Sequence, residues 1–136
     1  MVRNVLRGLA AAVLYLGAGD YARAQSEAQF DACHQKESTT EIVGCLDGVT
    51  READRRLNAA YQKALKSIDP SGVPALRAAE RAWLEFRKQR CYYLSAGPGT
   101  IGQVVGADCV ATMTKARADE LEGDSKALAS ECRPRR

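Results

Sequence analysis

A cysteine beside a histidine is the residue pair in this sequence that most resembles a nucleophilic centre. Cys33 directly precedes His34, the only histidine among the 136 residues. Neighbouring residues on one helix point about 100° apart, so the imidazole cannot readily accept the thiol proton. Asp119 and Glu122 form a carboxylate pair, but no apolar surroundings mark them as a tuned acid and base. The sequence therefore indicates a disulfide at Cys33 and a protein that is not an enzyme.

Metal, cofactor and phosphate sites lack their usual sequence patterns. The chain has no C-x-x-C pair and a single histidine, which argues against zinc. Gly97, Gly99 and Gly102 follow a predicted helix rather than a strand, and the lysine of a phosphate-binding loop is missing. We interpret these glycines as turn formers and expect neither a metal nor a cofactor.

The N-terminus has the pattern of a secretory signal peptide. Two arginines precede an apolar run over residues 9–19, and Ala22-Arg23-Ala24 supplies a small-x-small cleavage pattern. A membrane span needs about 20 apolar residues, more than this run provides. No lipid-attachment cysteine follows Ala24. We predict cleavage between Ala24 and Gln25 and a periplasmic or secreted protein with no integral membrane anchor.

The charge of the chain argues against a nucleic-acid partner. The predicted signal peptide carries a net charge of +2, so its removal lowers the net charge from +3 to +1. Charges of both signs are interspersed along the remaining chain, as is typical of solvated helix surfaces. A nucleic-acid-binding domain instead has a basic excess on one face. We therefore expect no nucleic-acid partner.

All five cysteines follow the predicted cleavage site. In an oxidising compartment an even set forms bridges and the odd cysteine keeps a free thiol. The sequence does not fix the connectivity, and our prediction pairs sequence neighbours, each pair stabilising the fold by about 3 kcal/mol. The predicted disulfides are Cys33–Cys45 and Cys91–Cys109, with Cys132 free.

Apolar residues recur at steps of three and four along three long segments, a pattern typical of amphipathic helices. Ser38 and Glu41 form a capping box at the start of the first segment, where Thr39 is an alternative cap. This segment ends at 69–72, which contains two helix breakers, and Pro74 suits the first turn of the next helix. We predict helices over 26–35, 39–68, 74–94 and 103–121.

The fold class that follows is all-α, a small antiparallel helical bundle stapled by two disulfides. Phe86, Leu94 and Val105 belong to the apolar stripes that are expected to face the core. The chain shows no internal repeat and no second domain. We predict a cleaved signal peptide over 1–24, one helical domain over 25–122 and a short basic tail over 123–136.

Several polar residues are embedded in these apolar stripes. Arg87 comes four residues after Trp83, so its guanidinium can stack on the indole ring. One interpretation is a hydrogen-bonded network that fixes the register of the helices. The other is a groove that recognises a ligand, and Arg87 can serve both. The residues concerned are Asn58, Tyr61, Trp83, Arg87, Thr114 and Arg117.

The order of these residues resembles the LprI-type lysozyme inhibitor family, whose members are small exported bacterial proteins. Its most specific part is a Trp-x-x-aromatic-Arg segment that ends in a cysteine. The resemblance spans roughly Cys33 to Leu121. The matching motifs are Cys33…Thr40-Glu41…Cys45, Ala53-Asp54…Leu57-Asn58…Tyr61, Leu76-Arg77-x-Ala79-x-Arg81-Ala82-Trp83-x-x-Phe86-Arg87-x-x-x-Cys91 and Cys109…Thr114…Arg117…Leu121.

The resemblance implies inhibition of lysozyme-type cell-wall hydrolases by binding, and it carries over no catalytic residue. The sequence departs from the family at three places. Lys88 stands where members often have an aspartate, Gly97-Pro98-Gly99 replaces paired glycines, and the lipid-attachment cysteine of the lipoprotein that names the family is absent. The alternative is an envelope-stress or immunity protein that neutralises a different toxin or effector.

A basic and aromatic cluster at the end of the predicted 74–94 helix is the candidate contact surface. A lysozyme cleft contains two catalytic carboxylates, which basic groups would meet with favourable electrostatics. Tyrosine and arginine are enriched among the residues that dominate binding energy. The alternative is an ordinary solvated helix end. The candidate residues are Arg87, Lys88, Arg90, Tyr92 and Tyr93.

Overall fold

The computed structural model describes the backbone of residues 18–131 and the side chains of residues 24, 25 and 27–127. This part of the chain forms four α-helices and one 3₁₀ turn, with no strand, so the all-α prediction is confirmed. In chain order the elements are α1 (Ala18–His34), α2 (Thr39–Ser67), η1 (Pro70–Gly72), α3 (Val73–Ser95) and α4 (Ile101–Glu131).

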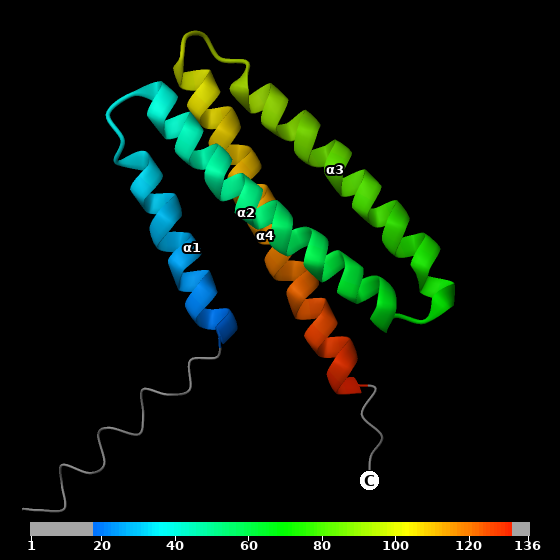
Figure 1. Ribbon diagram of the computed structural model, residues 1–136. Helices are drawn as coiled ribbons and strands as arrows, with labels where there is room; N and C mark the ends of the chain where they lie inside the picture. Colours follow the sequence, from blue (N-terminus) through cyan, green and yellow to red (C-terminus); the bar gives the residue numbers. More distant parts are fainter. Residues whose placement is uncertain (1–17, 132–136) are drawn as a thin grey trace, which may run out of the picture.

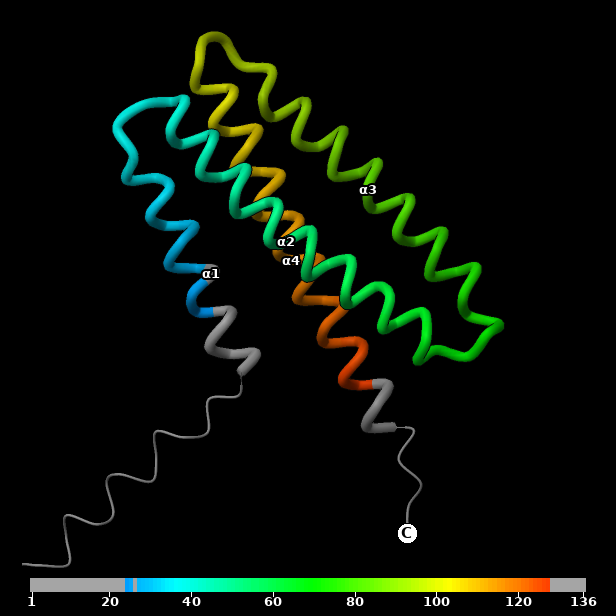
Figure 2. The backbone as a smooth tube through the Cα atoms, viewed as in Figure 1, coloured from blue at the N-terminus to red at the C-terminus, as the bar shows by residue number. Residues whose placement is uncertain are grey.

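Successive helices run in opposite directions, as an antiparallel bundle requires (Figure 1). α2 and α4 therefore run the same way, and they cross at the centre of the molecule with α1 on one side and α3 on the other (Figure 2). The most extensive packing in the described structure is between α2 and α4, followed by α3 against α4. The core is consequently a central helix pair flanked by two outer helices.

Small residues let the central pair approach closely. The core has two clusters: Cys33, Leu46, Val49 and Ala111 form one, and Leu57, Ala60, Ala118 and Leu121 form the other. Alanines occur on both α2 and α4 in these clusters, and a short side chain keeps the helix axes near each other. Tyr61, Leu76 and Trp83 extend the second cluster toward α3.

The start of α2 has the predicted capping box. The backbone N–H of Glu41 donates to the Ser38 hydroxyl at 3.2 Å, and the Ser38 N–H donates to the Glu41 carboxylate at 3.1 Å. Ser38 has extended backbone angles and is the cap, so Thr39 is the first helical residue. Such a cap stabilises a helix by about 1 kcal/mol because it satisfies donors that the helix leaves unpaired.

The predicted break between the second and third helices is also present. Asp69 accepts hydrogen bonds from the Ser71 hydroxyl at 2.6 Å and the Ser71 N–H at 2.9 Å. These bonds favour the ionised carboxylate, so the pKa of Asp69 is lowered from its ordinary value. Pro70 begins η1, and Pro74 lies in the first turn of α3 as expected.

Two helices are longer than predicted. α4 continues past the expected end at Leu121 to Glu131, through Gly123. Burial of Leu121 in the core offsets the helix cost of that glycine. The predicted tail over 123–136 is therefore helical up to 131. Cys132 and the remaining tail lie outside the described residues.

α1 begins at Ala18 rather than near residue 26. The bond between Ala24 and Gln25, where cleavage was predicted, therefore lies inside α1. Residues 1–17 of the predicted signal peptide lie outside the described part of the chain. None of the described helices is both long enough and apolar enough to cross a membrane.

Two glycines at the α3–α4 connection, Gly99 and Gly102, have different structural roles. Gly99 has a φ of +78°, a conformation that L side chains rarely adopt. Gly102 was predicted as a turn former, but it lies within α4. A Cβ at Gly102 would stand 2.4 Å from the Ser95 carbonyl oxygen. Glycine is needed at this position because the backbones of α3 and α4 meet there.

Both predicted disulfides are present. Cys33–Cys45 joins α1 to α2 and Cys91–Cys109 joins α3 to α4, with Cα–Cα distances of 5.4 and 5.5 Å. The predictions for the inner faces are wrong at Phe86, which is 56% exposed, at Val105, which is 38% exposed, and at Leu94, which is 37% exposed. Arg87 takes the inward position on α3, and its neighbour Phe86 points about 100° away from it.

Candidate functional site

Arg87 is the centre of a polar cluster that connects three helices. Its guanidinium carbon lies 5.0 Å from the centroid of the Trp83 ring. Its Nη1 atom donates to the Thr114 hydroxyl at 2.6 Å and lies 3.3 Å from an Asp54 carboxylate oxygen. Thr114 is fully buried and donates to the Val110 carbonyl at 2.7 Å. A single side chain of α3 thus contacts both α2 and α4.

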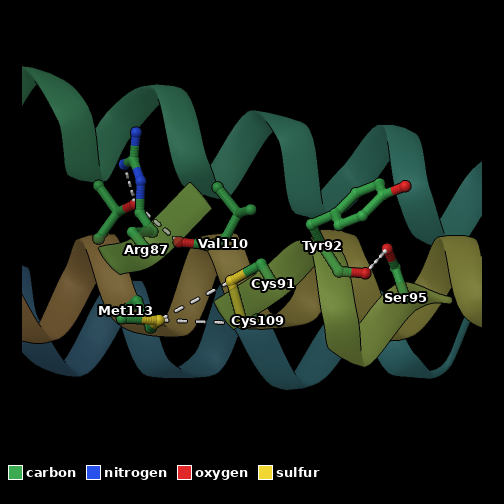
Figure 3. The surroundings of a disulfide bond; sticks show 8 residues. Arg87, Cys91, Tyr92, Ser95, Cys109, Val110 and Met113 are labelled. Carbon is green, nitrogen blue, oxygen red and sulfur yellow. Dashed lines mark hydrogen bonds between the residues drawn. A yellow bond between two sulfur atoms is a disulfide. The ribbon is translucent and has the colours of Figure 1, made fainter. Parts of the chain in front are cut away.

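The cluster lies next to the disulfide between α3 and α4. Figure 3 shows Arg87 one helical turn before Cys91, with the Met113 sulfur beside the bridge. This sulfur is 3.8 Å from the Cys91 sulfur and 3.9 Å from the Cys109 sulfur. The covalent link and the polar contacts therefore fix the same section of α3 against α4.

Arg117 approaches the same tryptophan from α4. Its guanidinium carbon lies 5.9 Å from the Trp83 ring centroid. Two guanidinium nitrogens donate to Glu80 at 3.0 and 3.1 Å, and a third lies 2.8 Å from Glu120. Burial lowers the pKa of Arg117, but the hydrogen bonds to Glu120 and Glu80 outweigh it and leave the pKa raised. Trp83 is thus contacted by two cations that are held in place by carboxylates.

Asn58 and Tyr61 occupy a different position from the other four residues of the expected network. Within the described structure no hydrogen bond joins either side chain to Trp83, Arg87, Thr114 or Arg117. Instead, Asn58 and Tyr61 line a groove of about 460 Å³ between α2 and α3, together with Arg77 and Arg81. The six residues are therefore divided between a packed polar cluster and an open groove, which we name the α2–α3 groove. 

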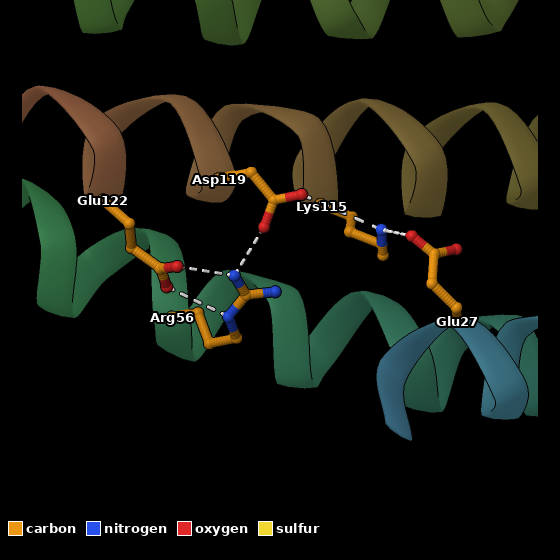
Figure 4. Close-up of polar contacts among 5 residues, drawn as sticks. All are labelled: Glu27, Arg56, Lys115, Asp119 and Glu122. Carbon is orange, nitrogen blue, oxygen red and sulfur yellow. Dashed lines mark hydrogen bonds and ion pairs between the residues drawn. The ribbon is translucent and has the colours of Figure 1, made fainter. Parts of the chain in front are cut away.

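A second polar cluster joins α1, α2 and α4, and sequence reasoning missed it (Figure 4). Arg56 donates to Glu122 at 2.8 and 3.0 Å and to Asp119 at 2.6 Å. The bonds to Glu122, followed by those to Asp119, raise the pKa of Arg56 despite partial burial. Lys115 pairs with Glu27 of α1 and lies 3.8 Å from Asp119. These contacts fix α1 and α2 to the opposite side of α4 from α3.

One feature of the sequence points to this second cluster. Lys115, Asp119 and Glu122 follow one another at steps of four and three, so they share a face of one helix. Their partners are more than sixty residues away, at Arg56 and Glu27. No local spacing indicates contacts over such separations.

The candidate contact surface is exposed except for Arg87. Tyr92 is 73% exposed, Tyr93 is 61% exposed, and Lys88 and Arg90 also face solvent. Lys88 lies 3.9 Å from Glu85 on the same helix. Arg87 points inward to Thr114, and its side chain is only 19% exposed. We use the name helix-end patch for Lys88, Arg90, Tyr92 and Tyr93.

Cys33 and His34, the pair that most resembled a nucleophilic centre in the sequence, have structural roles. Cys33 is a disulfide half, and His34 lies 2.9 Å from Asp108 of α4. His34 also contacts the Phe30 ring edge-to-face at 5.1 Å. Among the described residues no group of three or more histidine, cysteine, aspartate or glutamate side chains is placed to hold a metal ion.

Comparison with known proteins gives one match. The family model described as lysozyme inhibitor LprI matches residues 31–121, which is more than half of the chain. This range begins before the first disulfide, includes both polar clusters apart from Glu27 and Glu122, and contains the helix-end patch. No curated protein and no solved structure matches the chain.

Proposed function

The chain belongs to the LprI lysozyme inhibitor family, and from this premise we propose that it is an exported protein that binds and inhibits a lysozyme-type cell-wall hydrolase. The family match over residues 31–121 is the observation that carries the proposal. Inhibition by binding needs a rigid surface and no reactive group. Two disulfides and two polar clusters between helices supply that rigidity.

Export is part of the proposal. The two disulfides suit a periplasmic or secreted protein, since cytosolic thiols are kept reduced. The N-terminal signal pattern and the small-x-small sequence before Gln25 support the same compartment.

We propose the helix-end patch as the surface that contacts the hydrolase. Tyr92 and Tyr93 expose most of their surface, so each ring offers apolar area and a hydroxyl at little entropic cost. Lys88 and Arg90 add positive charge, which complements the two carboxylates of a glycosidase cleft. Ile101, 63% exposed at the start of α4, follows the adjoining loop and extends the apolar area.

A turbidity assay tests both parts of this proposal. Cell-wall suspension is treated with lysozyme and increasing amounts of the oxidised chain from Gln25 to Arg136. We expect dose-dependent protection, lost when Lys88→Glu and Arg90→Glu are combined, because the reversed charges repel the cleft carboxylates.

The control is Lys63→Glu combined with Lys66→Glu, which makes the same charge change on exposed residues at the far end of α2. Circular dichroism verifies that both variants stay folded. No protection by the unmodified protein at large molar excess, across several lysozyme types, would overturn the inhibitor proposal. Equal protection by the Lys88/Arg90 variant would overturn the patch and leave the inhibitor proposal standing.

A further inference from the structure

The α2–α3 groove has the size and shape of a small-molecule site. Its volume of about 460 Å³ falls within the range of known ligand pockets. Leu57 of α2 and Leu84 of α3 contribute its apolar surface. Leu57 is buried, whereas Leu84 is 43% exposed. The groove shares no residue with the helix-end patch, so it requires a separate explanation.

The charges around the groove are unbalanced. Its two carboxylates are paired with arginines that do not line it: Asp54 with Arg87 at 3.3 Å, and Glu80 with Arg117 at 3.0 Å. Arg77 and Arg81 lie one helical turn apart on α3. Within the described structure, neither side chain forms an ion pair or a hydrogen bond. Two uncompensated positive charges therefore line one wall.

The two arginines are placed to act together. Arg77 and Arg81 are four residues apart on α3, so they lie on the same face of the helix. Like charges at this spacing destabilise a helix by a few tenths of a kcal/mol. A bound carboxylate would remove this repulsion, and guanidinium groups match carboxylate oxygens with pairs of parallel hydrogen bonds.

The opposite wall offers neutral polar groups. The Asn58 amide and the Tyr61 hydroxyl have no hydrogen-bond partner within the described structure, and both line the groove. Asn58 can donate to and accept from an amide at once, and Tyr61 presents a ring face beside a hydroxyl. The walls are therefore complementary to a ligand that carries a carboxylate and an amide.

We propose that the α2–α3 groove binds a small carboxylate ligand that contains amide groups, with Arg77 and Arg81 holding the carboxylate and Asn58 and Tyr61 holding the amide part. Two sources have this chemistry. One is a muramyl peptide released from cell wall, which has an acetamido sugar, and the other is a short acidic peptide without sugar.

Titration followed by ¹H–¹⁵N NMR tests the proposal on the disulfide-bonded chain from Gln25 to Arg136. The probes are muramyl dipeptide, the dipeptide alanyl-isoglutamine without the sugar, and muramyl dipeptide with its carboxylate converted to an amide. We expect saturable shifts at Asn58, Tyr61, Arg77 and Arg81 with a carboxylate probe. The amidated probe should bind at least tenfold more weakly, and added salt should weaken binding by the carboxylate probes.

Arg77→Gln combined with Arg81→Gln should weaken binding at least tenfold, because both charge-assisted hydrogen bonds are lost. Lys63→Gln combined with Lys66→Gln is the matched control and should bind as the unmodified chain does. Tighter binding of muramyl dipeptide than of the free dipeptide would assign the cell-wall source, and equal binding would assign the peptide source.

Three results would overturn the proposal: no shifts with any probe at 10 mM, equal binding of the amidated probe, or unchanged binding by the Arg77/Arg81 variant. Because lysozyme inhibition is measured separately and through a different surface, the failure of either proposal leaves the other untouched.

Discussion

One inward-facing arginine, Arg87, connects α3 to both α2 and α4. Arg87 stacks on Trp83, donates to buried Thr114 and reaches Asp54, so it contacts groups on three helices. The Trp83–Arg87 spacing of four residues allowed the stacking to be foreseen from sequence. The expected network included both Arg87 and Thr114, but their direct hydrogen bond could not be foreseen, because a separation of 27 residues carries no periodic signal. Local spacing finds partners within a helix and misses those between helices.

Arg87→Met tests the energetic importance of this residue. Methionine keeps the aliphatic packing on Trp83 and removes the hydrogen bond to Thr114, so we expect a loss of about 2 kcal/mol in the free energy of unfolding. Urea unfolding followed by circular dichroism measures it. Arg90→Met, the same change at an exposed site on the same helix, should alter stability by less than about 0.5 kcal/mol. Equal losses in the two variants would show that the Thr114 contact contributes nothing.

At the level of elements, helix boundaries that carry a local chemical signal were predicted closely, whereas the start of α1 and the end of α4 were misplaced. The start of α2 is marked by a capping box and the start of α3 by Pro74, both of which are local chemical signals. The end of α4 was misplaced because Gly123 resembles a stop signal. Its helical conformation is maintained by burial of Leu121, a tertiary effect that no local signal reports.

Two glycines of α4 should respond oppositely to alanine. Gly123 is exposed and its Cβ would meet nothing within 4 Å, so Gly123→Ala should raise stability by about 1 kcal/mol and the midpoint of thermal unfolding by about 4 °C. Gly102→Ala should lower both, because its Cβ would stand 2.4 Å from the Ser95 carbonyl oxygen. Differential scanning calorimetry separates the two. A lower midpoint for Gly123→Ala would contradict the proposed account of α4.

For the whole molecule, the bundle architecture and the disulfide pairing were predictable, whereas the arrangement of the helices around a central pair was not. Apolar periodicity shows that each helix has a buried face, but it does not show which helix covers that face. α4 contacts partners on several sides, so its pattern is the least informative of the four. A groove was anticipated only as an alternative role for the six embedded polar residues, and of these only Asn58 and Tyr61 line the α2–α3 groove.

Removing both disulfides should unfold much of the bundle. The bridges close loops with sequence separations of 12 and 18 residues. Each contributes about 3 kcal/mol in the chain-entropy model. The two losses should add because the bridges join different helix pairs, and a total of about 6 kcal/mol is a large share of the 5–15 kcal/mol typical of a domain.

Far-UV circular dichroism and urea unfolding of three alanine variants measure this: Cys33/Cys45, Cys91/Cys109 and all four cysteines replaced. Cys132→Ala is the control and should match the unmodified chain if Cys132 is unpaired. A fourfold variant no less stable than either double variant would contradict independent contributions.

The placement of the two bridges also divides the molecule into separable halves. One covalently closed hairpin is α1 with α2, the other is α3 with α4, and only the short segment around η1 connects them along the chain. The halves are otherwise joined by noncovalent contacts, among them the packing of α2 on α4 and the ion pairs around Arg56, Lys115 and Arg87. A chain cut within η1 would therefore consist of two fragments, each closed by its own disulfide. If the two fragments reassociate, the bundle can serve as a split protein that reassembles from two separate chains.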